Sequence, residues 1–363
     1  MKLPIKQSIL DMRPYQQGKS DLDGIENPIK LSSNELSYGP SPLAIDAFIA
    51  ASSELNRYPD GGQTELRRAI SDVFGLPVDN LICGNGSEEL LQLLIRAFSC
   101  EGDEVLLSEN GFVMCQVYIS TQGATAVVAP EKDYKVDVDA LLARVTARTR
   151  IVIIANPNNP TGTYLSRTEV ERLHAGLPDD VLLVLDGAYA EFVVREDYES
   201  GENIVAKSDN VVMTRAFSKI YGLSALRIGW AYCPTDIIDI LRRVRSPFSA
   251  NAAAMAAAAA AVRDLEFTAM VIEKNESWLQ RLRVEFTAIG IEVIESVSNF
   301  YLLRFPGGAG KNSKDAANHL QANGIIPRPV SDDGDNKYLR ITVGSDEENQ
   351  AVVTALQDYM NND

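Results

Sequence analysis

Histidine and cysteine are scarce in this sequence of 363 residues, and their scarcity limits the kinds of site that it can hold. The two histidines, His174 and His319, lie far apart in the chain. The four cysteines show no Cys-x-x-Cys spacing, so a zinc site is not expected. We expect instead a cytoplasmic protein with reduced, structural thiols at Cys83, Cys100, Cys115 and Cys233.

Basic residues and long apolar runs are also under-represented. The 34 lysines and arginines face 50 acidic residues, which gives a net charge of −16 and an isoelectric point near 4.7. Such a charge disfavours nucleic acids and anionic membranes as partners. The N-terminus lacks the apolar segment of a signal peptide. The least polar stretch, 250–262, is mostly alanine and too short to span a bilayer, so we expect a packed helix.

The sequence does contain a series of short apolar runs separated by segments of helical periodicity. These runs of Val, Ile and Leu do not alternate with polar residues, which is typical of strands buried on both faces of a mostly parallel sheet. An α/β fold with helices on both sides of the sheet follows. Ligands of such sheets bind at the carboxyl ends of the strands. The predicted strands are 81–83, 104–107, 124–128, 151–155, 181–185, 210–214 and 229–232.

The pattern changes near residue 247, which predicts two domains and an arm. Residues 247–363 contain a long helical region, about 250–289, and then mixed strands and helices, which predict a smaller α+β domain. Residues 1–30 are broken by prolines and glycines and predict an extended arm with one short helix, packed with the small domain. Residues 31–246 would form the large domain.

The segment Gly84-Asn85-Gly86-Ser87 directly follows a predicted strand and opens a helix. Ser87 could cap this helix, and Gly86 allows a ligand to approach the backbone closely. The free N–H groups of a helix N-terminus bind phosphate. An ordinary capped helix would look the same, so this segment alone leaves both interpretations open.

Three other segments place polar or aromatic side chains near the ends of predicted strands. Asn156-Pro157-Asn158-Asn159-Pro160 follows strand 151–155, and its prolines give either a rigid loop that fixes an amide or a plain turn. Asp186 follows the next strand, where a buried carboxylate needs a cationic partner unless it caps a helix. Phe112 could stack on a ligand ring or belong to the core.

Lys219 lies after strand 210–214, eight residues before Arg227. A lysine there can bond covalently to an aldehyde cofactor while the arginine holds a phosphate, although Ser-Lys alone is more often part of a surface turn. The whole stretch from Thr214 to Trp230 resembles the Ser-Lys-x-x-Gly-Leu-x-x-x-Arg-x-Gly segment of fold-type-I pyridoxal-phosphate (PLP) aminotransferases. The string Asn-Pro-x-Asn-Pro-Thr-Gly at 156–162 resembles the same family.

This resemblance implies a homodimeric, PLP-dependent aminotransferase. Lys219 would carry the cofactor, and Asp186 would pair with the pyridine nitrogen so that the ring stays an electron sink. Asn159 and Tyr189 would contact the phenolic oxygen, and Tyr58 would reach the partner's cofactor phosphate across the dimer interface. The remaining cofactor contacts would come from Gly86, Ser87, Phe112, Ser218 and Arg227.

A narrower resemblance, to histidinol-phosphate aminotransferases, is carried by the segments 14–19, 30–35, 38–42, 324–328 and 339–344. It implies transfer of an amino group between L-histidinol phosphate and 2-oxoglutarate in histidine biosynthesis. The implied substrate contacts are Tyr15, Asn34, Arg328 and Arg340. The sequence departs from that family in having Leu36-Ser37 for Asn-Pro, Gly187 for Glu, Phe112 for Tyr, and Pro327 beside Arg328. These departures remove no catalytic group and bear on the choice of substrate.

Three alternatives compete with this interpretation. An aromatic amino-acid aminotransferase acting on phenylalanine or tyrosine would need a similar pocket, because imidazole and phenyl rings differ little in shape. A PLP-dependent decarboxylase of a phosphorylated amino acid shares much of the motif set. A PLP-binding regulatory protein with a vestigial site is disfavoured by the intact Lys219, Asp186, Asn159 and Arg340.

Overall fold

The centre of the molecule is a seven-stranded sheet, seen in a computed structural model that describes residues 3–12, 14, 18–307, 311–330 and 337–361. The strand order is β2-β10-β9-β8-β7-β3-β4. Only β10 runs antiparallel to its neighbours in this sheet, which confirms the predicted mostly parallel α/β arrangement. The strands are β2 (Leu81–Gly84), β3 (Glu104–Ser108), β4 (Thr125–Ala129), β7 (Thr149–Ala155), β8 (Leu182–Asp186), β9 (Val211–Ala216) and β10 (Gly229–Tyr232).

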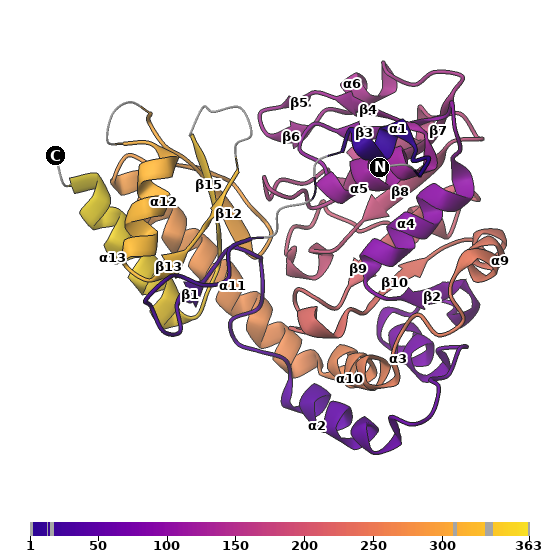
Figure 1. Ribbon diagram of the computed structural model, residues 1–363, viewed down its shortest axis with the longest axis horizontal. Helices are drawn as coiled ribbons and strands as arrows, with labels where there is room; N and C mark the ends of the chain where they lie inside the picture. The colour runs from indigo at the N-terminus through magenta and orange to yellow at the C-terminus, as the bar shows by residue number, and fades with distance from the viewer. Residues whose placement is uncertain (1–2, 13, 15–17, 308–310, 331–336, 362–363) are drawn as a thin grey trace.

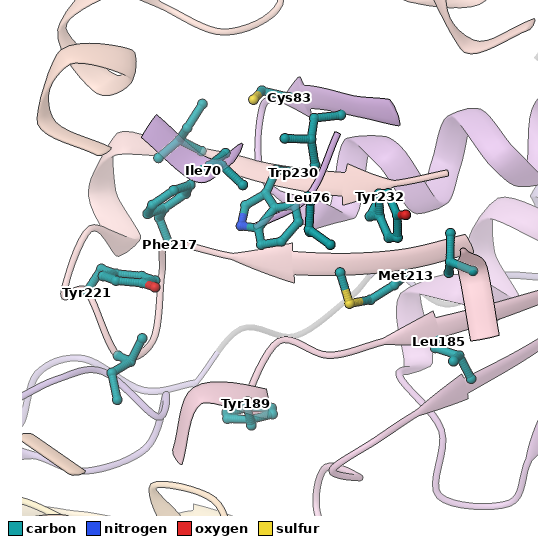
Figure 2. Packing of buried hydrophobic residues seen from close by; sticks show 14 of the residues in the cluster. Ile70, Leu76, Cys83, Leu185, Tyr189, Met213, Phe217, Tyr221, Trp230 and Tyr232 are labelled. Carbon is teal, nitrogen blue, oxygen red and sulfur yellow. The ribbon is translucent and has the colours of Figure 1, made fainter. Parts of the chain in front are cut away.

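Helices cover both faces of this sheet because its inner strands are apolar on both sides (Figure 1). One core cluster joins one face to α4 (Ser87–Phe98), α5 (Val113–Gln122) and α9 (Thr235–Val244). The cluster on the other face includes Trp230, Tyr232 and Met213, which Figure 2 shows among the packed side chains. It is completed by α3 (Thr64–Phe74), α6 (Val138–Leu142), α7 (Arg167–Ala175) and α10 (Ala252–Arg263). Helix α2 (Pro42–Ala51) packs against α10, and the short helix α8 (Glu202–Val205) contacts β9.

A second, four-stranded antiparallel sheet lies in the C-terminal part of the chain, in the order β11-β12-β15-β14. Its own core cluster includes Leu31 and residues of three helices. The elements are β11 (Glu292–Ile294), β12 (Phe300–Arg304), β14 (Arg328–Pro329), β15 (Tyr338–Thr342), α11 (Leu265–Ala288), α12 (Ser313–Ala322) and α13 (Asp346–Asn361). Two small pairs, β1 (Ile29–Lys30) with β13 (Ile325–Ile326) and β5 (Glu131–Lys132) with β6 (Lys135–Val136), complete the strands of the described residues.

The long helical region predicted at about 250–289 is two helices, α10 and α11, that meet at Asp264. Asp264 leaves the helical conformation and its side chain caps α11 by accepting the N–H of Phe267 at 3.1 Å. Figure 1 shows α10 beside α2 and α3, and its alanines belong to the core of the seven-stranded sheet. The domain boundary at 246/247 therefore stays a prediction.

The N-terminal arm contacts both parts of the molecule. Its short helix α1 (Gln7–Leu10) lies near α5, where the Lys6 amine donates to the carbonyl of Thr121 at 2.9 Å. Further along, the Lys19 amine donates to Gln321 at 3.2 Å, and β1 pairs with β13. Among the residues that the structure describes, no helix is long and apolar enough to cross a membrane. No cluster of potential metal ligands occurs in that same part of the chain.

Candidate active site

Asp186 is the last residue of β8, and its carboxylate is buried at the carboxyl end of the parallel sheet. The strand register sets it opposite Thr214 of β9, whose hydroxyl donates to the carboxylate at 3.1 Å. Burial raises the pKa of Asp186 to about 6, although the Thr214 hydrogen bond, a backbone N–H and the charge of Lys219 act in the opposite direction. A buried carboxylate whose charged form is disfavoured fits a cationic partner, such as a protonated pyridine nitrogen.

Lys219 projects from the loop after β9 into the same region. Its amine donates to the carbonyl of Ser33 at 3.2 Å and lies 5.5 Å from the ring centroid of Tyr189. The loop is anchored by Phe217 and Tyr221, whose ring centroids are 4.9 Å apart and which Figure 2 shows within the packed core. The lysine is thus held on a rigid support, as a residue that bonds covalently to a cofactor must be.

The turn before α4 and Arg227 form a cradle suited to a phosphate. Gly86 has φ +84°, and a Cβ there would lie 2.9 Å from Nη2 of Arg227. At Gly229 a Cβ would lie 2.3 Å from the backbone nitrogen of Ser87, so β10 packs tightly against the start of the helix. Nη1 of Arg227 lies 3.4 Å from the Ser218 hydroxyl. Backbone N–H groups, a hydroxyl and a guanidinium converge here, which is the donor set that phosphate needs.

The expectation that Ser87 caps α4 is wrong. Gly86 occupies the N-cap position, without a side-chain hydrogen bond, and Ser87 is the first helical residue. The carboxylate of Glu89 instead accepts the N–H of Asn85 at 2.6 Å. The positive φ of Gly86 shifts the start of the helix by one residue, because glycine adopts that conformation without a steric penalty.

Asn159 and Tyr189 each take part in a hydrogen bond that orients the functional group. Nη1 of Arg340 donates to Oδ1 of Asn159 at 2.6 Å. Because arginine can only donate, the amide oxygen faces Arg340 and the NH₂ group is left for another acceptor. The hydroxyl of Tyr189 accepts from Nδ2 of Asn34 at 2.9 Å.

Two arginines predicted to bind substrate lie on neighbouring strands of the small sheet. Arg328 of β14 and Arg340 of β15 are direct cross-strand partners in the antiparallel register. Nη2 of Arg340 also donates to the carbonyl of Ser32 at 2.7 Å, and its guanidinium lies 5.4 Å from the ring centroid of Phe300. Cross-strand partners project from the same face of a sheet, and two arginines on one face suit an anion that carries two negative charges.

In the described part of the single chain, some of the predicted site residues form no hydrogen bond with Asp186, Lys219, Arg227 or Arg340. Tyr58 is 83% exposed in the single chain and stacks on Phe248, with ring centroids 4.7 Å apart. Phe112 is half-buried at the N-cap of α5, against the core on that side of the sheet. Asn34 is buried with φ +55° and supports Tyr189. Tyr15 lies outside the described residues.

Sequence reasoning missed two contributors, Thr214 and the carbonyl of Ser33. Thr214 reaches Asp186 only because the register of β8 and β9 sets the two residues opposite each other. Ser33 contacts Lys219 from 186 positions away in the sequence. Both residues lie within segments that carry the family resemblance, but nothing local in those segments indicates either contact, so the signal for both is tertiary.

The comparisons with known proteins agree with this geometry. Residues 26–356 match the family described as aminotransferase class I and II. The chain is 50% identical over 360 residues to a histidinol-phosphate aminotransferase of Maricaulis maris, covering 99% of each protein. It is 49% identical over 352 residues to the enzyme of that name from Paramagnetospirillum magneticum, covering 97% of each.

A solved structure is also similar. The histidinol-phosphate aminotransferase of Sinorhizobium meliloti, crystallised in complex with pyridoxal-5'-phosphate, matches with a TM-score of 0.85 and 28% identity. The match covers 92% of this chain and 90% of that one. With the family match spanning most of the sequence and a lysine, a buried aspartate and a phosphate cradle at the carboxyl end of its sheet, this chain belongs to the aminotransferase class I and II family.

Proposed function

We propose that this protein is a PLP-dependent histidinol-phosphate aminotransferase, which exchanges an amino group between L-histidinol phosphate and 2-oxoglutarate. The observation that carries this proposal is the cross-strand pair Arg328 and Arg340. Arg340 donates to the carbonyl of Ser32, and Lys219 donates to the carbonyl of the next residue, Ser33. The phosphate ester of histidinol phosphate stands where other amino donors have a carboxylate, and a dianion favours two cations over one. The two relatives with about half of their residues identical to this chain carry the same activity in their names.

The residues present fit PLP at each of its polar groups. Lys219 would hold its aldehyde carbon, and Asp186 its ring nitrogen. Gly86, Ser87, Ser218 and Arg227 would hold the phosphate. Asn159 and Tyr189 would donate to the phenolic oxygen, and Phe112 would cover a ring face. When bound, PLP supplies an electron sink for the electron pair left at the substrate Cα after its proton is removed.

The side chains of this protein then divide the remaining work. The buried Asp186 carboxylate keeps the ring nitrogen protonated, because an ion pair offsets the cost of burying both charges. The Lys219 amine would be the base that takes the proton from the substrate Cα, and as the resulting acid it could return a proton. Its support by the buried Phe217 limits the motion of this base.

At the substrate end, Arg340 would donate hydrogen bonds to either the phosphate of histidinol phosphate or a carboxylate of 2-oxoglutarate, because its guanidinium can bind two oxygens at once. Arg328 is the second cation and favours the phosphate. Its position opposite Arg340 supports this assignment. Tyr15 is the third proposed contact, on the resemblance alone. Asn34 is the fourth proposed substrate contact, and its amide donates to the hydroxyl of Tyr189.

We also propose that the enzyme is a homodimer in the cytoplasm. Several large apolar side chains in and beside α2 are exposed in the single chain, among them Leu43, Ile49 and Leu55. Tyr58 and Phe248 extend this apolar surface. A second copy of the chain would cover it and receive Tyr58 at its cofactor phosphate. Within each subunit we divide the chain into an arm (1–30), a large domain (31–246) and a small domain (247–363).

Single-turnover measurements on the yellow PLP enzyme test the substrate assignment. Histidinol phosphate, phenylalanine, tyrosine and glutamate are added in turn without a keto acid, and conversion to the pyridoxamine form is followed by absorbance. We expect histidinol phosphate and glutamate to convert the enzyme with the highest efficiency. Faster conversion by phenylalanine or tyrosine would favour an aromatic aminotransferase, and release of CO₂ from a phosphorylated amino acid would favour a decarboxylase.

A further inference from the structure

Glu131, the first residue of β5, has its carboxylate between two loops of the candidate site. Its Oε1 accepts the backbone N–H of Asn110 at 3.1 Å and Nδ2 of Asn158 at 3.0 Å. Its Oε2 accepts Nδ2 of Asn110 at 2.8 Å. One side chain therefore joins the loop after β3 to the loop after β7.

Both loops carry a residue proposed to contact PLP. Asn110 lies two residues before Phe112, and Asn158 directly precedes Asn159. The side-chain amide of Asn158 connects Glu131 to Asn159, because its Oδ1 accepts the backbone N–H of Asn159 at 3.0 Å. Glu131 fixes the NH₂ end of the Asn158 amide and the Asn159 backbone fixes the oxygen end, so the orientation of this amide is determined from both sides.

The hydrogen-bonding partners also determine which form of Glu131 fits. All three bonds to its carboxylate come from N–H donors. An ionised carboxylate accepts at both oxygens, whereas a protonated one would turn a hydroxyl toward a donor. Burial raises the pKa of Glu131, and the donors from Asn110 and Asn158 lower it.

We propose that Glu131 is a positioning residue of the cofactor site: its carboxylate ties the loop of Phe112 to the loop of Asn159 and so fixes both residues relative to the bound PLP. The inference rests on the proposed PLP chemistry. It gives a function to a polar side chain that belongs to none of the motifs of the sequence.

The test compares wild type with Glu131→Ala and Glu131→Gln, using two measurements on the PLP-loaded protein without substrate. One is the dissociation constant of PLP, and the other is the pKa of the visible absorption change of the bound cofactor. In the Ala variant we expect PLP binding about tenfold weaker, because buried donors lose their acceptor and the Asn159 contact loosens. The visible pKa should rise, since a hydrogen bond from Asn159 favours the ionised phenolic oxygen.

The Gln variant should recover part of both effects, because its single oxygen can still accept from Asn158 and from the Asn110 backbone. Glu104→Ala is the matched control. Glu104 is also a buried carboxylate next to β7, accepts from Thr146 at 2.6 Å and pairs with Arg148, but lies at the amino end of β3. This control should lower the melting temperature and leave the PLP dissociation constant and the visible pKa unchanged.

Glu131→Ala behaving like Glu104→Ala, with a lower melting temperature alone, would overturn the positioning role. If Glu131→Ala does not fold, Asn158→Ala cuts the same connection from the other side and keeps the bonds between Glu131 and Asn110. It should also raise the visible pKa, and an unchanged visible pKa would count equally against the proposal. A wild-type protein that binds no PLP would instead overturn the proposed function on which this inference depends.

Discussion

The side-chain amide of Asn34 donates a hydrogen bond of 2.9 Å to the hydroxyl of Tyr189. Both side chains are buried, and the backbone N–H of Asn34 is itself held by the hydroxyl of Thr342 at 2.9 Å. Because the NH₂ group of Asn34 can only donate, the proton of Tyr189 must point to another acceptor. In the PLP enzyme we expect that acceptor to be the phenolic oxygen of the cofactor.

Asn34→Asp tests this relationship. The new carboxylate would accept the proton of Tyr189 and withdraw it from the cofactor, so the pKa of the visible absorption change should rise, as it should in Tyr189→Phe. Titrating the substrate-free enzymes by absorbance measures both shifts. If Asn34 instead acts only on the substrate, its variant would change KM for histidinol phosphate and leave this titration as in wild type.

Asp186→Asn should have opposite effects on turnover and on the stability of the apoprotein. Turnover should fall severely, because a neutral ring nitrogen makes a poor electron sink. Burial raises the pKa of Asp186 from 3.8 to about 6, so its ionisation destabilises the fold as the pH rises from about 4 through 6. Above that range the Asn apoprotein should be more stable than wild type by up to about 3 kcal/mol, and below it the gain should vanish.

Urea unfolding of both apoproteins at pH 4 and pH 7.5 measures this difference, with turnover recorded in parallel. Asp186 is not a helix cap, because the next helical turn begins at Ala190 with Tyr189 at its N-cap and no side-chain cap. An Asn variant that keeps most of its activity would show that Asp186 serves only the fold.

Tyr58→Phe should weaken PLP retention, and mixing experiments can show whether Tyr58 acts across a dimer interface. In a hybrid of Tyr58→Phe and Lys219→Ala subunits, a tyrosine that acts in trans places both lesions in one site and leaves the other site intact. Activity should therefore recover on mixing. A hybrid that forms, as verified by mass spectrometry, and recovers neither activity nor PLP affinity would exclude the trans role.

Arg328→Ala and Arg340→Lys should affect the amino donors differently. Arg328→Ala should slow the half-reaction with histidinol phosphate far more than the one with phenylalanine, because the dianionic phosphate loses its second cation. Arg340→Lys should slow both half-reactions, since a point charge cannot fork to two oxygens. Rapid-mixing rates with each donor measure the effect. Equal losses for both donors in Arg328→Ala would move the assignment to an aromatic aminotransferase.

The sequence correctly predicted which site residues follow the ends of strands, because runs of apolar residues and the turns after them are local features of the sequence. Apolar runs place Asp186 and Asn159 at the ends of neighbouring parallel strands, and the glycine turn places Gly86 before α4. The antiparallel direction of β10 carries no such signal, since its run looks like the others. The prediction that Ser87 caps α4 was wrong for a local reason, because Gly86, with its positive φ, occupies the N-cap position.

Contacts between distant segments were beyond sequence reasoning. Asn34 stays a predicted substrate contact, and its hydrogen bond to Tyr189, 155 positions away in the chain, had no local signal. Glu131 belongs to no motif, and its hydrogen bonds depend on two loops that converge only after folding. The role proposed for Tyr58 requires a second subunit, which one chain cannot show.

The most direct measurement for the whole account is the position at which borohydride fixes the cofactor. Holoenzyme reduced with borohydride, digested and mapped by mass spectrometry should carry a phosphopyridoxyl group on the peptide that contains Lys219. Lys219→Ala should still bind PLP noncovalently through the phosphate cradle and Asp186, yield no modified peptide and show no turnover. A phosphopyridoxyl group on any other lysine, in wild type or in Lys219→Ala, would contradict the account.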